Sequence, residues 1–141
     1  MSRRNARKHI FNLIFQLEFN KDDKLEVKET LDTYNEEYKS FDEEYKDFIS
    51  REYRGIVANL DSIDSYISNY APGWTIERLA KTELAVLRIG IYEIVFDSEI
   101  PDAVAVNESV ELAKIFGGDK APAFVNAVLN NVVKSKTNIE Q

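Results

Sequence analysis

The chain has 141 residues, of which 44% are hydrophobic, with a formal net charge of −7 and no cysteine. This length suits one domain or two small halves that share a core, and the lack of cysteine excludes disulfides and thiolate metal sites. The first residues show neither the apolar run nor the cleavage site of a signal peptide. The longest apolar run, 84–96, is interrupted by two charges and is shorter than the roughly 20 residues that span a bilayer. We therefore expect a cytoplasmic protein with no membrane partner.

The charge is unevenly placed along the chain. Residues 1–17 hold four basic side chains and no acid, whereas residues 18–53 hold thirteen acids against six bases and so carry a net −7. The acidic stretch is typical of a solvated helical face, although it could also bind a basic protein. The basic end is the place to look for a polyanionic ligand.

The first half of the chain has helical periodicity throughout. We expect one helix over about 2–17 and a second over 25–39. Ser40-Phe-Asp-Glu43 has the form of a capping box, and we expect a single long helix from there to residue 70. Its apolar residues recur at alternating spacings of four and three, as in a coiled-coil seam: Ile49, Tyr53, Ile56, Leu60, Ile63 and Ile67.

The second half begins after Tyr70-Ala-Pro-Gly73, a sequence that ends a helix. We place the boundary between the two halves there, 1–70 and 73–136 of one domain over 1–141. A short helix near 75–81 should lead into 84–96, which is apolar nearly all round and should be buried, with Gly90 allowing a close neighbour.

The last two helices have clear start and stop signals. Pro101 suits the first turn of one helix, and Gly117-Gly118 ends it. Asp119 is a natural N-cap for the last helix, and the polar residues from Lys134 onward should fray. The core positions of the last helix are Val125, Val128, Leu129 and Val132. The pattern predicts an all-α fold of two small helical bundles packed together.

One face of the first helix combines cations with aromatic rings. Arg4, Lys8, Phe11 and Phe15 share this face, which differs from the stripe that carries Ile10. Single-stranded nucleic acid is bound by this combination, because cations track phosphates and rings stack on bases. The alternative is that the two rings fill a second packing interface and the cations are merely exposed.

The turn Gly117–Phe124 is a second candidate site. Free amides of residues 120 and 121 at a helix N-terminus, together with Lys120, would favour an anion. The alternative is an ordinary connection between helices, with glycine as the stop signal and Asp119 as the cap. The two glycines do not have the spacing of a P-loop.

The buried helix and its neighbour carry a minority of polar residues: Glu83, Arg88, Glu93, Asn107, Glu108 and Glu111. Carboxylates in a helical bundle can bind metal or act as acid–base pairs, but the one histidine is His9 and no Glu-x-x-His pair exists. We expect Arg88 to form an ion pair with a glutamate, and we expect no metal, no cofactor and no enzymatic activity. A small helical enzyme that uses Arg88 and carboxylates is an alternative, and it would need an enclosed polar pocket.

Three stretches of the sequence are similar to the sequences of one protein family. They are Glu83-Leu-Ala-Val-Leu-Arg-Ile-Gly-Ile-Tyr-Glu93, Ala105-Val-Asn-Glu-Ser-Val-Glu-Leu-Ala-Lys114 and Phe124-Val-Asn-Ala-Val-Leu129. With the Arg-Arg-x-Ala-Arg run at 3–7, the chain resembles the NusB family of transcription antitermination factors, most strongly over 77–132.

The resemblance implies about seven helices in two packed three-helix bundles. It also implies an RNA-binding factor without enzymatic activity, which binds boxA-type rRNA leader RNA together with the ribosomal protein NusE. The complex then helps RNA polymerase to resist termination, so RNA polymerase and other Nus factors are implied as indirect partners. A protein-interaction adaptor without RNA contact, using the acidic first half, is a further alternative.

The resemblance also assigns roles to particular residues. It implies RNA contacts for Arg3, Arg4 and Arg7 and for the aromatic Phe15, and we add Lys8 from the shared helix face. In the turn before the last helix it implies RNA contacts for Lys120 and Phe124, and it places Glu83 at the NusE-facing surface. Lys8 and Asn5 shorten the arginine run, and Lys120 stands where relatives can carry an acid.

These assignments predict how binding should behave. An acidic protein with a small basic face should bind RNA weakly alone, and NusE should tighten binding by about 1–3 kcal/mol. Three or four phosphate contacts predict a log–log salt slope of about −2 to −3. Replacing Arg4 or Arg7 by alanine should weaken RNA binding without lowering the melting temperature. An exposed Phe11 or Phe15 would allow a homodimer.

Overall fold

The structure is a computed structural model and describes residues 2–19 and 27–140. Within these ranges it is helical and contains no strand. The elements are α1 (Arg3–Leu17), α2 (Val27–Glu37), α3 (Glu43–Ala58), α4 (Leu60–Tyr70), the 3-10 turn η1 (Ile76–Arg78), α5 (Lys81–Ile91), the π-helical turn η2 (Tyr92–Phe96), α6 (Asp102–Phe116) and α7 (Ala121–Glu140). The prediction of an all-α fold with about seven helices is confirmed. In the described ranges, no helix is both long and apolar enough to cross a membrane.

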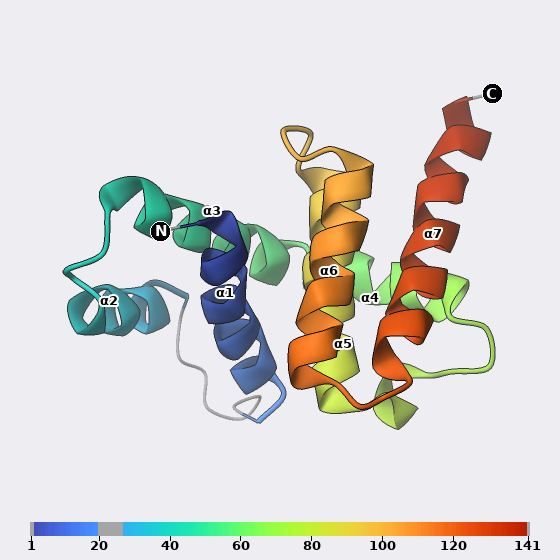
Figure 1. Cartoon of the computed structure of the whole chain (residues 1–141), viewed down its shortest axis with the longest axis horizontal. Helices are drawn as coiled ribbons and strands as arrows, with labels where there is room; N and C mark the ends of the chain where they lie inside the picture. The colour runs from blue at the N-terminus through green and yellow to red at the C-terminus, as the bar shows by residue number, and fades with distance from the viewer. Residues whose placement is uncertain (1, 20–26, 141) are drawn as a thin grey trace.

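The helices form two groups that meet along α5. Figure 1 shows α1, α2 and α3 on one side and α4 to α7 on the other. α5 packs against α1, α3, α4, α6 and α7 and is therefore the centre of the molecule. α4 packs on α5 and α7, so by packing the two groups divide at Asn59, whereas we predicted a division after Tyr70.

The prediction of one long helix from the capping box to residue 70 is wrong. α3 ends at Ala58 and α4 begins at Leu60, because the backbone of Asn59 (φ −112°, ψ 19°) leaves the helical region. The Asn59 side-chain amide donates to the Gly55 carbonyl at 2.8 Å, as asparagine does where it competes with helix hydrogen bonds. The apolar seam stays buried across the break, except for the half-buried Leu60.

Three other predicted boundaries also differ. α3 begins at Glu43 with Asp42 as its N-cap residue, so Ser40 lies outside the helix and the predicted capping box does not form. α2 spans Val27–Glu37, and residues 25 and 26 of the predicted helix lie outside the described residues. The short helix expected near 75–81 is only the single turn η1.

The C-terminal half otherwise follows its predicted signals. α4 ends before Pro72, and Gly73 takes a positive φ of 82°. α6 follows Pro101 and ends before Gly117. α7 begins at Ala121, so Lys120, rather than Asp119, occupies the position before the helix. The predicted core positions of α7 are all buried.

The predicted fraying after Lys134 does not occur at the residues that follow it. Ser135 is buried, and the Lys136 ammonium group donates to the Ile94 carbonyl at 2.8 Å and to Asp102 at 2.9 Å. These contacts hold α7 against Ile94 and Asp102 beyond Lys134, and the helix continues to Glu140.

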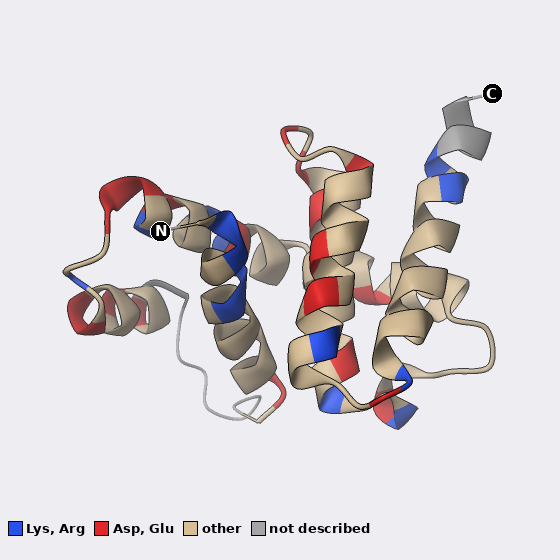
Figure 2. Cartoon of the chain, in the orientation of Figure 1, with Lys and Arg blue, Asp and Glu red and all other residues tan. Residues whose placement is uncertain are grey.

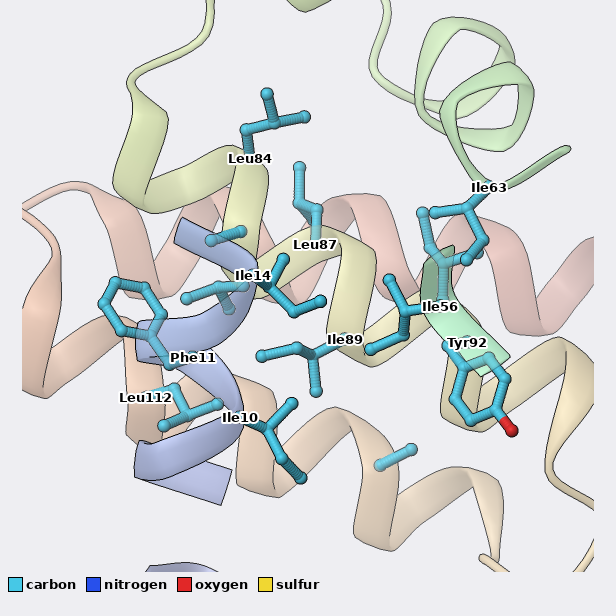
Figure 3. Packing of buried hydrophobic residues seen from close by; sticks show 14 of the residues in the cluster. Ile10, Phe11, Ile14, Ile56, Ile63, Leu84, Leu87, Ile89, Tyr92 and Leu112 are labelled. Atoms are coloured by element: carbon cyan, nitrogen blue, oxygen red, sulfur yellow. The ribbon is translucent and has the colours of Figure 1, made fainter. Parts of the chain in front are cut away.

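α5 is buried on all sides, as predicted. Its residues from Leu84 to Ile91 are all buried, and those that carry a side chain are each at most 2% exposed. Figure 3 shows Leu87 and Ile89 of α5 among Ile10 and Ile14 of α1, with Leu112 of α6 nearby. The helix then widens into η2, where the Asp97 amide donates to the Tyr92 carbonyl at 3.1 Å.

At Gly90, α5 lies close against α6 and α7. A Cβ atom there would lie 2.6 Å from Ser109 Oγ and 2.7 Å from Leu129 Cδ1. We expect Gly90→Ala to lower the free energy of unfolding by about 1–3 kcal/mol, because overpacking a filled core forces its neighbours to move. Urea denaturation would measure this. Gly118→Ala is the control, since nothing lies within 4 Å of a Cβ at Gly118; equal effects of the two substitutions would contradict the prediction.

Candidate nucleic-acid interface

Arg7 lies in the interior rather than at the surface. Its side chain is 4% exposed, and Nε and Nη2 donate to the Glu93 carboxylate at 3.0 Å each. Burial works against the charged guanidinium, but the hydrogen bonds and the charge of Glu93 outweigh this and raise the pKa of Arg7. The prediction that Arg7 faces RNA is therefore corrected: Arg7 joins α1 to η2.

Glu52 of α3 lies beside this ion pair and is completely buried. Its two carboxyl oxygens make no hydrogen bond in the described structure. Burial raises the pKa of Glu52 well above its usual range, and the negative charge of Glu93 raises it further. Burial and the charge of Glu93 thus favour the neutral form of Glu52 beside the ion pair of Arg7 and Glu93.

The other basic residues of α1 reach the surface. Arg3 is exposed, and its guanidinium lies 4.6 Å from the centre of the Phe48 ring. Arg4 is also exposed but donates through Nε and Nη2 to Glu108 of α6, both at 3.1 Å. Lys8 is half-buried, and no acid of the described residues forms an ion pair with it. Figure 2 shows the basic residues of α1 beside the acidic residues of α6.

The aromatic half of the predicted face on α1 is partly core. Phe11 is 3% exposed and stacks on Phe116 of α6 with ring centres 4.0 Å apart. The expectation that Phe11 lies outside the core is therefore wrong, and the alternative of a second packing interface holds for this ring. Phe15 is half-buried and lies between Phe11 and Phe19, and Phe19 is 63% exposed. The row of rings thus runs from the core to the surface.

A second cluster joins aromatic rings and cations at the start of α7. Phe124 meets Trp74 edge to face at 5.8 Å, and the Arg78 guanidinium lies 5.6 Å from the Trp74 ring. Trp74 is 44% exposed, and Lys120 is exposed just before α7. In Figure 1 the end of α1, the turn between α6 and α7 and the start of α7 lie along the same edge of the molecule. We call Trp74, Arg78, Lys120 and Phe124 the α7 cluster.

The amide prediction for this turn is only partly right. The Ala121 amide donates to the Gly118 carbonyl at 3.0 Å, so it is not free for an anion. Of the two amides predicted for an anion, that of residue 121 is therefore already used, and the exposed Lys120 side chain is the cation of this turn.

Arg88 forms the ion pair that we predicted, and also a second one. It donates to Glu18 at 2.6 Å and, through two nitrogens, to Asp64 at 2.9 and 2.8 Å. Glu83, in the first turn of α5, is half-buried, and burial raises its pKa. Among the described residues, no hydrogen bond or ion pair joins Glu83 to the basic side chains of α1 or to the α7 cluster.

A cavity of about 400 Å³ lies between α1 and α2. His9, Tyr34 and Tyr53 are among the side chains that line it, whereas Arg88 and Glu93 are not. Burial lowers the pKa of His9. The enzyme alternative required a polar pocket around Arg88, and this cavity does not supply it.

Comparisons with known proteins agree with this arrangement. The model of the NusB family matches residues 4–134. The chain belongs to the NusB family. A transcription antitermination protein NusB of Clostridium tetani is 38% identical, with 95% of this chain and 99% of that protein covered. That of Clostridium novyi is 40% identical, with 96% and 100% covered.

Solved structures give the same assignment. NusB of T. maritima has a TM-score of 0.84 and is 34% identical, with 100% of this chain and 99% of that chain covered. A chain from a structure of antitermination factors NusB and NusE in complex with dsRNA shares the fold, with a TM-score of 0.82 and 24% identity. It covers 94% of this chain, and 96% of that chain is covered.

Sequence reasoning missed two residues of the α7 cluster in this NusB-family chain. Trp74 and Arg78 lie far from Phe124 in the sequence, and only the fold brings them together. A signal was available, since the one tryptophan of the chain follows a Pro-Gly turn, where a large ring is poorly placed to be buried.

The burial of Arg7 gives a test of its structural role. We expect Arg7→Met to lower the free energy of unfolding by about 3–5 kcal/mol, because Glu93 would be left buried without its partner. Denaturant unfolding would measure the loss. Arg3→Met, at an exposed arginine, should change stability little. The double variant Arg7→Met/Glu93→Leu should recover part of the loss; no recovery, or equal losses for Arg7 and Arg3, would contradict this role.

Glu52 should make stability depend on pH. Because the folded protein raises its pKa, the folded state binds the proton more tightly than the unfolded state, so this glutamate costs stability as the pH rises above about 4.5. The cost grows by at most about 1.4 kcal/mol per pH unit until the folded pKa is passed. We expect Glu52→Gln to become progressively more stable than the parent between pH 5 and pH 8.

Urea denaturation across this pH range would check the prediction. Glu36→Gln is the control, because the Glu36 side chain is 80% exposed. A stability difference between Glu52→Gln and the parent that does not change with pH would show that Glu52 is not held protonated.

Proposed function

We propose that this protein is an RNA-binding transcription antitermination factor. In this proposal it binds boxA-type rRNA leader RNA together with the ribosomal protein NusE in the cytoplasm and helps RNA polymerase to resist termination. It acts by binding and not as an enzyme. Membership of the NusB family over residues 4–134 is the observation that carries the proposal, because its relatives are named transcription antitermination protein NusB.

Two surfaces of the chain supply the chemistry for RNA. On α1 we propose contacts from Arg3, Arg4 and Lys8, with Phe15 as a partly exposed ring at the far end of the helix. The α7 cluster supplies a second surface, in which exposed Trp74 and half-buried Phe124 can stack on bases while Arg78 and Lys120 neutralise phosphates. Arg7 is left out, since it is already bound to Glu93.

Binding of NusE would offset the negative charge of the chain, which opposes RNA binding. The chain has a net charge of −7, and its acids are concentrated in the first half, so long-range repulsion opposes RNA binding. A basic ribosomal protein docked on an acidic surface would reduce this repulsion and extend the RNA-binding surface. A similar fold comes from a solved complex of NusB and NusE with dsRNA, which supports both kinds of partner. We propose that Glu83 lies at the NusE-facing surface.

The alternative function, a protein-interaction adaptor, differs from this proposal in that the protein would not contact RNA. The exposed carboxylates of α2 and early α3, including Glu29, Glu36, Glu43 and Glu44, could bind NusE without any RNA contact. The exposed tryptophan with its neighbouring arginine favours the RNA reading, because an acidic docking surface gives no reason for either.

Fluorescence titration with a labelled boxA-like single-stranded RNA tests the proposal. We expect tighter binding than to a scrambled RNA, a log–log salt slope of about −2 to −3, and tightening by about 1–3 kcal/mol when NusE is added. Trp74→Ala should weaken binding by about 1–3 kcal/mol through lost stacking.

Phe96→Ala is the matched control, since Phe96 is another exposed ring (38%) at the opposite end of α5 from the α7 cluster. Equal affinity for the two RNAs with and without NusE would contradict the proposal. Retained NusE binding in that case would establish the adaptor instead.

A further inference from the structure

Glu108 of α6 forms an ion pair with Arg4 of α1, and this pair is more accessible than that of Arg7 with Glu93. The Arg4 side chain is 58% exposed, and it is held by Glu108, which is 17% exposed. The two hydrogen bonds join Nε to Oε2 and Nη2 to Oε1, both at 3.1 Å. This is a bidentate pair in which one edge of the guanidinium faces the carboxylate.

This geometry leaves Arg4 able to donate, within a pair that has no net charge as a whole. The pair uses Nε and one side of Nη2, so the donors of Nη1 are not taken by Glu108. A phosphate could still approach the free edge, but it would meet an arginine whose charge is already balanced, with a carboxylate beside it. Such an arginine contributes hydrogen-bond geometry but little long-range attraction.

Neighbouring charges make Glu108 the decisive acid at this place. Glu111 lies one turn further along α6 and also acts on Arg4, but its carboxylate is bound to Lys114 at 3.1 Å. The buried Arg7 is neutralised by Glu93. Among the basic residues of α1, only Arg3 and Lys8 therefore keep an uncompensated charge in the described structure.

We propose that Glu108 limits the RNA affinity of α1. By offsetting the charge of Arg4 while leaving donors free, it weakens the attraction of α1 for any polyanion, whatever the base sequence. This inference rests on the proposed function, because it concerns how strongly the same surface binds RNA. It makes Glu108 an affinity-limiting residue that contacts protein rather than RNA.

Glu108→Gln tests the inference, because glutamine keeps the size of the side chain and one acceptor oxygen but removes the charge. At low salt the variant should bind boxA-like single-stranded RNA about 3–10-fold more tightly, the effect of removing one screened surface charge. Its log–log salt slope should be steeper by about 0.7, which corresponds to one more neutralised phosphate. Scrambled RNA should gain by a similar factor, because contacts with phosphates carry no sequence information.

Two controls isolate the local effect. Glu99→Gln removes the same charge from another exposed arginine pair, with Arg51 Nη1 at 2.7 Å, and should change RNA affinity less than about twofold if the effect at Glu108 is local. In the background of Arg4→Gln, the gain from Glu108→Gln should largely disappear, because the two residues act as a pair. A melting curve for each variant checks that it is folded.

The outcomes separate the inference from the function beneath it. RNA binding by the parent protein together with unchanged affinity and slope for Glu108→Gln would overturn the inference alone. Weaker binding by Glu108→Gln would also overturn it and would show that Glu108 positions Arg4 for RNA. If neither the parent nor the variant binds RNA with or without NusE, the proposed function itself fails, and the inference fails with it.

Discussion

Two arginine–carboxylate clusters, both nearly removed from solvent, fix how the two helical groups meet. Arg7 of α1 binds Glu93 of η2, while Arg88 of α5 binds Glu18 and Asp64. Taking such charges out of water costs several kcal/mol each, which is recovered only when the hydrogen-bond geometry is good. The apolar surface of α5 could slide along its neighbours, but these bidentate contacts define one position. The placement of every surface residue on α1 depends on that position.

This constraint explains how one helix serves two purposes. Arg7 points inward and fixes the rotation of α1, so Arg3, Arg4 and Lys8 are presented outward or along α6. Phe11 completes the attachment through its stack on Phe116. The basic residues of α1 look like a single binding patch in the sequence. The fold divides them into one structural arginine, Arg7, and a small exposed group. The charge left for a ligand is smaller than the sequence suggests.

The features of the fold that depend on local sequence spacing could be predicted from the sequence. The helical class, the burial of α5 and the tight contact at Gly90 follow from periodicity and residue size. The break at Asn59 could not be predicted, because the apolar seam continues across it and only the docking of α4 requires it. The inward position of Arg7 could partly be predicted, because Arg7 stands three residues before Ile10 on the core stripe. The contact between Trp74 and Phe124 could not be predicted, because it depends on tertiary packing alone.

The partner of Arg7 lies 86 residues further along the chain. α1 precedes η2 along the chain, yet Arg7 on its inward face finds its carboxylate partner only when η2 has been made and has joined the core. Contacts of such sequence separation form late, because the loop between them must close first. A nascent chain that has not yet reached Glu93 therefore cannot hold α1 at its final rotation. The final arrangement of Arg3 and Arg4 on α1 thus depends on a contact that the C-terminal half supplies.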